Sequence, residues 1–235
     1  MKRKKSKGET KQARTAQAEA RSTARGKDTR KARVVARAEL PTRYGAFAIL
    51  GFERPSEARA LRISADGDGS DGAVALVHGK IRAGDAPLVR IHSQCLTGDV
   101  FHSLRCDCRA QLEMALRETA RARCGIVLYL PQEGRGIGLM NKLKAYELQD
   151  RGMDTVEANR ELGFEADHRD YEFCADALKL LGVKRVRLLS NNPDKVAQLE
   201  RAGIRVVERV PCRPRTSRHS REYLKVKRKK MGHLD

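Results

Sequence analysis

The second half of the chain alternates short apolar runs with amphipathic segments, and this alternation limits the possible folds more than any other feature. The runs at 125–130 and 186–190 have the length of buried strands, and each is followed by a helical pattern. Strands that alternate with helices indicate an α/β layer arrangement. The predicted elements of this half are strands at 125–130, 186–190 and 204–207, and helices at 110–121, 137–150, 171–181 and from Asn192-Pro193 to before Gly203.

The first half has a different pattern, which predicts antiparallel strands. Residues 44–52 and 73–78 form strand-like runs, a loop rich in charge, Gly and Asp separates them, and residues 88–92 form a third run. Strands that follow one another without helices favour antiparallel pairing. We therefore expect an α/β fold with a mixed sheet flanked by helices, spanning residues 39–235 as one domain.

Residues 1–38 differ from the rest in composition and are predicted to be a disordered basic arm. The chain carries a net charge of +19; residues 1–37 hold 14 Lys or Arg against three acids, which leaves +8 for everything after them. The segment has no aromatic residue and little apolar periodicity. A solvated arm is favoured over an organellar or nuclear targeting signal, and the charge makes contact with nucleic acid conceivable without predicting it as the function.

Three of the six cysteines crowd together at Cys95, Cys106 and Cys108, which suggests a metal site in a reduced protein. Soft thiolates suit zinc, and a Cys-x-Cys pair without a second pair leaves a fourth position for water, as catalytic zinc sites do. His92 or His102 could instead close the site as a fourth ligand. Spacing alone does not choose between these readings and three buried thiols.

Two further segments carry charged or glycine-rich patterns. Residues 132–138 place three glycines and Arg135 between an apolar strand and a helix, which is the form of a phosphate cradle, although neither a dinucleotide nor a Walker motif is present. An extended segment would place Asp167 and Arg169 on one face. By itself this second segment favours a solvated charged turn.

These motifs together resemble the GTP cyclohydrolase II family over about residues 40–235. The resemblance rests on Arg90-Ile-His-Ser-Gln-Cys-Leu-Thr-Gly-Asp99, Arg105-Cys-Asp-Cys108, Gln132-Glu-Gly-Arg135, Lys144-Ala-Tyr-Glu-Leu-Gln-Asp150, Asp154-Thr-Val-Glu-Ala-Asn159, Asp167-His-Arg-Asp170, Ser190-Asn-Asn-Pro193 and Met231-Gly-His-Leu234. It implies a monofunctional homodimer that opens the imidazole ring of GTP. Formate and pyrophosphate are released, leaving 2,5-diamino-6-ribosylamino-4(3H)-pyrimidinone 5′-phosphate for riboflavin synthesis.

The resemblance also implies the roles of single residues. Cys95, Cys106 and Cys108 would bind one Zn²⁺ per chain, and Mg²⁺ would accompany the triphosphate. Asp167 would be the proton acceptor, Arg169 a nucleophile at the α-phosphate, and Tyr146 an active-site hydroxyl. Because arginine stays protonated, an electrostatic clamp is the simpler role for Arg169. The implied nucleotide contacts are Arg90, Ile91, His92, Ser93, Gln94, Gln111, Glu133, Gly134, Arg135, Thr155, Ser190 and Lys195, with Glu133 reading guanine and Arg135 and Lys195 meeting phosphate.

Three positions depart from the family pattern: Gln94 stands where Glu is frequent, Arg109 where Gly is usual, and Ser190 where Thr is common. The first two make the zinc environment more positive than usual by two charges. A paralogue with a truncated reaction or another pteridine-like pathway is therefore one alternative. A zinc-containing nucleic-acid binder is the other, although aromatic residues make up only 4% of the chain and offer few stacking platforms.

No stretch approaches the roughly 20 apolar residues that span a bilayer, and the N-terminus lacks an apolar signal core. We therefore expect a cytoplasmic protein without membrane contact.

Overall fold

The computed structural model describes residues 32–54, 72–164 and 171–214, and the single positions 220, 225, 232 and 234. The predicted arm up to residue 31 lies outside these residues. The strands are β1 (Arg33–Thr42), β2 (Gly45–Glu53), β3 (Gly72–His78), β4 (Leu88–Ser93), β5 (Gly125–Leu130), β6 (Arg185–Leu189) and β7 (Arg205–Val210). The helices are α2 (Leu96–Asp99), α3 (Cys108–Arg121), α4 (Leu139–Asp150), α5 (Thr155–Glu161), α6 (Glu172–Leu180) and α7 (Pro193–Arg201), with a tight turn η2 (Glu133–Gly136) before α4.

The seven strands form one sheet in the order β1-β2-β3-β5-β4-β6-β7. Antiparallel pairing joins β1, β2, β3 and β5, and parallel pairing joins β5, β4, β6 and β7. The expected mixed sheet is confirmed. Its two halves meet at β5, which pairs antiparallel on one side and parallel on the other.

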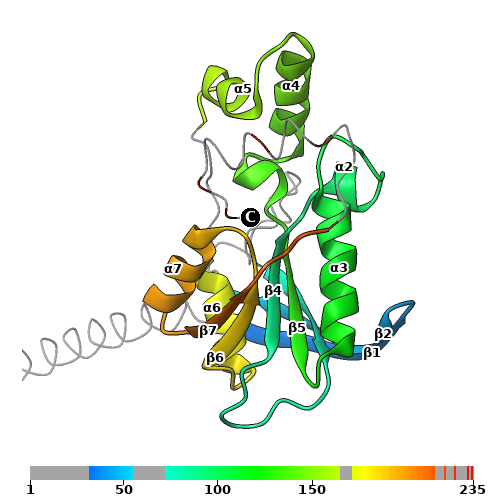
Figure 1. Cartoon of the computed structure of the whole chain (residues 1–235), viewed down its shortest axis with the longest axis vertical. Coiled ribbons are helices and arrows are strands. Elements are labelled where there is room, and N and C mark those ends of the chain that lie inside the picture. Colours follow the sequence, from blue (N-terminus) through cyan, green and yellow to red (C-terminus); the bar gives the residue numbers. More distant parts are fainter. Residues whose placement is uncertain are drawn as a thin grey trace, which may run out of the picture.

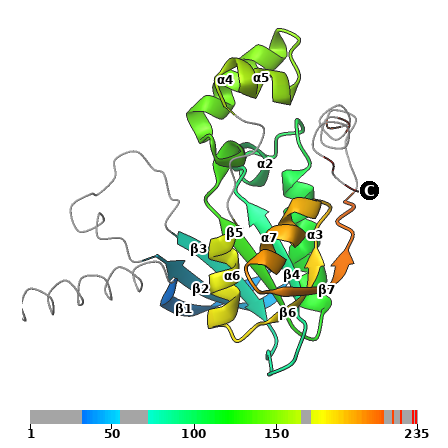
Figure 2. The same ribbon diagram turned by 90° about the vertical axis from the view of Figure 1, so that its left-hand side faces the viewer.

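Helices cover both faces of the sheet (Figures 1 and 2). On one face, Phe173 and Leu178 of α6 and Leu199 of α7 join the larger core cluster with strand residues such as Ile91. On the other face, α3 packs through Ala115 against Leu88, Val127 and Leu189. This double cover explains why β5 is a continuous apolar run, since both of its faces are buried.

Helices α4 and α5 stand beyond the ends of β4 and β5 and pack against each other (Figure 1). Helix α5, which the periodicity did not predict, begins at a capping box: Asp154 accepts from the backbone N–H groups of Val156 and Glu157, and the Glu157 side chain accepts from Asp154 N. This pair of helices therefore lies over the carboxyl ends of the parallel strands.

Several predicted boundaries differ from the structure by a few residues, and two of the differences have a clear physical cause. Strand β1 begins at Arg33, so residues 33–38, which were assigned to the arm, belong to the sheet; the strand lies at its edge and is mostly exposed, which leaves no apolar alternation to read. Helix α4 begins at Leu139 instead of Ile137, because Gly138 has a φ of +81° and interrupts the helical conformation. Among the described residues, no helix combines the length and apolarity needed to cross a membrane.

Candidate active site

A cavity of about 460 Å³ opens where β4, β5 and β6 end, under α4 and α5. Ligands of open α/β sheets commonly bind at this edge, beyond the carboxyl ends of parallel strands. The cavity brings together fifteen of the residues predicted for the site: Arg90, His92, Ser93, Gln94, Cys95, Cys106, Cys108, Gln111, Glu133, Gly134, Arg135, Tyr146, Thr155, Ser190 and Lys195.

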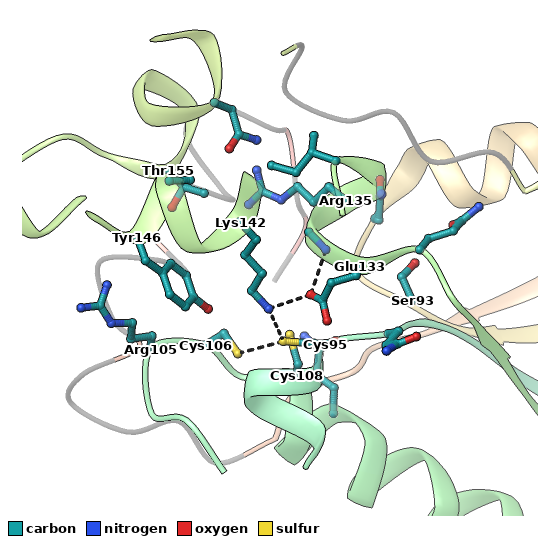
Figure 3. A pocket seen from close by; sticks show the side chains of 18 of the residues that line it. Ser93, Cys95, Arg105, Cys106, Cys108, Glu133, Arg135, Lys142, Tyr146 and Thr155 are labelled. Carbon is teal, nitrogen blue, oxygen red and sulfur yellow. Dashed lines mark hydrogen bonds and ion pairs between the residues drawn. The ribbon is translucent and has the colours of Figure 1, made fainter. Parts of the chain in front are cut away.

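The three predicted metal ligands form a compact thiolate cluster on the floor of the cavity (Figure 3). Their Sγ atoms all lie within 4.8 Å of one another, and those of Cys95 and Cys106 are 3.7 Å apart. Two sulfurs bound at about 2.3 Å to a tetrahedral zinc would be about 3.8 Å apart, so the cluster fits this ion. Within the part of the chain that the structure describes, neither His92 nor His102 belongs to this cluster, so neither is placed as a fourth ligand.

Local backbone structure holds the cluster together. Cys95 caps α2, Cys108 opens α3, and Gly98 of α2 packs directly over the sulfurs. A Cβ atom at position 98 would lie 3.0 Å from the Cys106 Sγ and 3.1 Å from the Cys95 Sγ. A side chain at position 98 would therefore require the sulfurs to shift by a few tenths of an ångström.

The three thiols have strongly divided acidities. The pKa of the Cys95 thiol lies far below its usual range, because Cys106 and Cys108 donate hydrogen bonds to its thiolate and Lys142 adds its positive charge. The pKa of Cys108 is raised, because its hydrogen bonds with Cys106 and Cys95 and its burial all disfavour a further negative charge. A divalent cation is the natural partner for such a cluster, since it stabilises all three thiolates together.

A buried carboxylate, Asp99, anchors the loop that carries the first ligand. Its Oδ2 accepts from Cys95 N at 3.1 Å and from the Tyr129 hydroxyl at 2.9 Å, and the carboxylate is 3.1 and 3.2 Å from His92 Nε2. Burial above all lowers the pKa of His92, so its ring is neutral and donates from Nε2. The Asp99 carboxylate thereby joins β4, β5 and α2 beneath the thiolates.

Replacing Asp99 by alanine is expected to lower the free energy of unfolding by roughly 3 kcal/mol, because it leaves buried donors on Cys95, His92 and Tyr129 without an acceptor. Urea unfolding of the metal-free protein measures this change. Asp150→Ala is the matched control: it removes an exposed acid paired with Arg105 and should cost less than about 1 kcal/mol. Equal losses in both variants would contradict the anchoring role of Asp99.

Both oxygens of the Glu133 carboxylate, the group predicted to read guanine, contact the protein itself. Oε2 accepts from Leu96 N at 2.6 Å, and Oε1 accepts from Gly134 N at 2.9 Å and from the Lys142 ammonium at 2.7 Å. Glu133 thus ties the start of α2 to α4. No sequence pattern indicates this contact, because Lys142 is not among the predicted site residues.

The cavity is cationic. Five cationic side chains line it against two carboxylates, Glu133 and Asp154. Arg90 donates to Leu189 O and Gln111 Oε1, and Lys195 donates to Ile91 O, so both are held in place by neighbouring strands. A surplus of positive charge in a partly enclosed cavity attracts an anionic ligand. The five cations are Arg90, Arg105, Arg135, Lys142 and Lys195.

The remaining predicted residues lie elsewhere. The Ile91 side chain is buried in the core, and only its backbone reaches toward the site, through the Lys195 contact. Asp167 and Arg169 lie outside the described residues. Arg109 does not line the cavity: its guanidinium donates to Glu113 and to Asp99 O, so Glu113 balances the extra charge expected there.

Fold and site together define an α/β protein in which a three-cysteine cluster able to hold a metal ion shares a cavity with cationic side chains. The chain belongs to the GTP cyclohydrolase II family, whose model matches residues 32–211. It is 52% identical over 204 residues to GTP cyclohydrolase-2 of Haemophilus influenzae (strain PittGG), covering 86% of this chain and 89% of that protein. Its identity to GTP cyclohydrolase-2 of Buchnera aphidicola subsp. Acyrthosiphon pisum is 49% over 201 residues, covering 86% and 97%.

Proposed function

We propose that this protein catalyses the zinc-dependent hydrolysis of GTP, the first step of riboflavin biosynthesis. The imidazole ring is opened with loss of formate, and pyrophosphate is released, which leaves 2,5-diamino-6-ribosylamino-4(3H)-pyrimidinone 5′-phosphate. The observation that carries the proposal is the position of the three thiolates, which share one cavity with Tyr146 and five cationic side chains.

At the metal end, Cys95, Cys106 and Cys108 would hold the zinc. Bound zinc acts as a Lewis acid and supplies an activated water at neutral pH. The Tyr146 hydroxyl is 3.2 Å from Thr97 Oγ1, and burial above all raises the pKa of Tyr146. This hydroxyl therefore keeps its proton at neutral pH and can donate a hydrogen bond to the opening imidazole. Arg105 lies 4.8 Å from the centre of the Tyr146 ring and fixes the ring's position.

At the other end, Arg135 and Lys195 would bind the phosphates. Arg135 stands in the turn η2 and Lys195 on α7, and both line the cavity. Thr155, at the start of α5, and Ser190, after β6, add hydroxyl groups to the lining. Mg²⁺ would come with the triphosphate as a hard cation on its oxygens. We assign proton acceptance to Asp167 and the clamp on the departing pyrophosphate to Arg169.

Zinc-loaded protein given GTP is expected to release formate and pyrophosphate and to form the pyrimidine product, while protein stripped by a chelator should lose ring opening and regain it with added zinc. Enzymatic assays for formate and pyrophosphate and mass spectrometry of the nucleotide measure all three products. Absence of all three from zinc-loaded protein would contradict the proposal. Accumulation of a formylated nucleotide would instead support a paralogue with a truncated reaction.

A further inference from the structure

Lys142 of α4 lies between the thiolate cluster and Glu133, where no sequence pattern placed it. Its Nζ is 3.2 Å from the Cys95 Sγ and 2.7 Å from Glu133 Oε1, and the residue is 9% exposed. Figure 3 shows the ammonium pointing down from α4 into this gap. It is also 5.6 Å from the centre of the Tyr146 ring. One cation thus contacts a metal ligand, a carboxylate and an active-site aromatic ring.

Stability alone gives little reason for a charge at this position. Moving an ammonium and a carboxylate out of water costs several kcal/mol for each ion, and well-packed apolar side chains of similar volume are often as stable or more so. Lys144, two residues along the same helix, is exposed. The buried lysine is therefore better explained by what its charge does to Cys95 and Glu133.

The charge balance of the thiolate site indicates that effect. Three thiolates around a divalent zinc give a net charge of −1, and electron donation from the sulfurs weakens the metal as a Lewis acid. An ammonium that donates a hydrogen bond to one thiolate offsets part of this negative charge and withdraws electron density from that sulfur. Its other contact holds Glu133, which in turn accepts from Leu96 N at the start of α2.

We propose that Lys142 is a positioning residue that keeps the bound metal electrophilic through the Cys95 sulfur and fixes Glu133 between α2 and α4. The inference rests on the proposed function, because it assumes that zinc on these thiolates drives the reaction. Lys142 acts through Cys95 and Glu133 and takes no part in bond breaking itself.

Replacing zinc by cobalt allows the electron donation of the Cys95 sulfur to be measured directly. In Co²⁺-loaded Lys142→Met, the sulfur-to-cobalt charge-transfer absorption should move to longer wavelength, because a thiolate without its hydrogen bond gives up electron density more easily. In the zinc enzyme, kcat should fall about 10- to 100-fold with a smaller change in KM. Lys144→Met is the matched control on the same helix and should change neither the absorption nor kcat.

Lys142→Met leaves the Glu133 carboxylate buried without its cation, so the double variant Lys142→Met with Glu133→Gln provides a second test in which both charges are removed. Its cobalt absorption should move in the same direction. An unchanged absorption in the folded variants would overturn the proposal, and so would a Lys142→Met enzyme with kcat within about threefold of the wild type. If wild-type zinc enzyme fails to turn over GTP, the proposed function fails, while the cobalt absorption still decides whether Lys142 acts on the Cys95 sulfur.

Discussion

Gly98→Ala is expected to lower zinc affinity by about 100-fold and to remove GTP turnover with it. The added methyl carbon would lie 3.0 Å from the Cys106 Sγ, 3.1 Å from the Cys95 Sγ and 3.2 Å from the Cys108 Cβ. The Cys95 loop has little freedom to withdraw, because Asp99 holds its backbone N–H. The contact is therefore relieved by spreading the sulfurs beyond the spacing that a tetrahedral ion requires. Competition with a chromophoric zinc chelator measures the affinity.

Val100→Ala is the matched control for this substitution. Val100 follows α2 directly, is 56% exposed and does not line the cavity. Its truncation should leave zinc affinity and turnover unchanged within a few tenths of a kcal/mol. If Gly98→Ala bound zinc as tightly as the wild type, the close packing of Gly98 would not set the spacing of the three sulfurs.

Arg169→Ala is expected to lower pyrophosphate release by about 1,000-fold or more. A guanidinium that stabilises charge on a transferring phosphoryl group contributes about 10³- to 10⁵-fold to the rate. An arginine stays protonated below about pH 12, so a clamp on the departing pyrophosphate requires no proton transfer from Arg169 itself. Stopped assays of pyrophosphate and formate on the same sample measure the two hydrolyses separately.

Arg160→Ala, which removes an exposed guanidinium from α5, is the control for the loss of one positive charge. Its pyrophosphate release should stay close to that of the wild type. Release at the wild-type rate from Arg169→Ala would exclude both the nucleophilic role and the clamp for this residue.

The burial of each element determined whether it could be predicted from the sequence. The run at 125–130 predicted β5 at its observed bounds, because a strand covered by helices on both faces is apolar throughout. Strand β1 was missed since it is an edge strand held by backbone hydrogen bonds with β2, and its exposed side chains carry no period. Helix α5 was not predicted because it is short and shows little periodicity. Asp154 and Glu157 nevertheless have the spacing of a capping box.

The site was predicted in part, and the missing part depends on contacts between distant segments. The spacing of Cys95, Cys106 and Cys108 left several readings open, and the surrounding motifs supplied the family. In the sequence Lys142 and Lys144 look alike on one helix; only the packing of α4 over the sheet buries the first against Cys95. Similarly, Arg109 looked like an added charge in the site, whereas its partner Glu113 becomes apparent only in the folded helix.

The backbone of η2 indicates a trade-off between stability and activity at Arg135. This residue has a φ of +65°, a left-handed conformation that costs an L-residue about 1–2 kcal/mol and that glycine adopts freely. The chain nevertheless carries a guanidinium here, at the wall of the cavity. A glycine at this position would relax the turn but would leave the cavity with one cation fewer. Selection for thermal robustness alone would therefore favour losing Arg135, and selection for binding an anion favours keeping it.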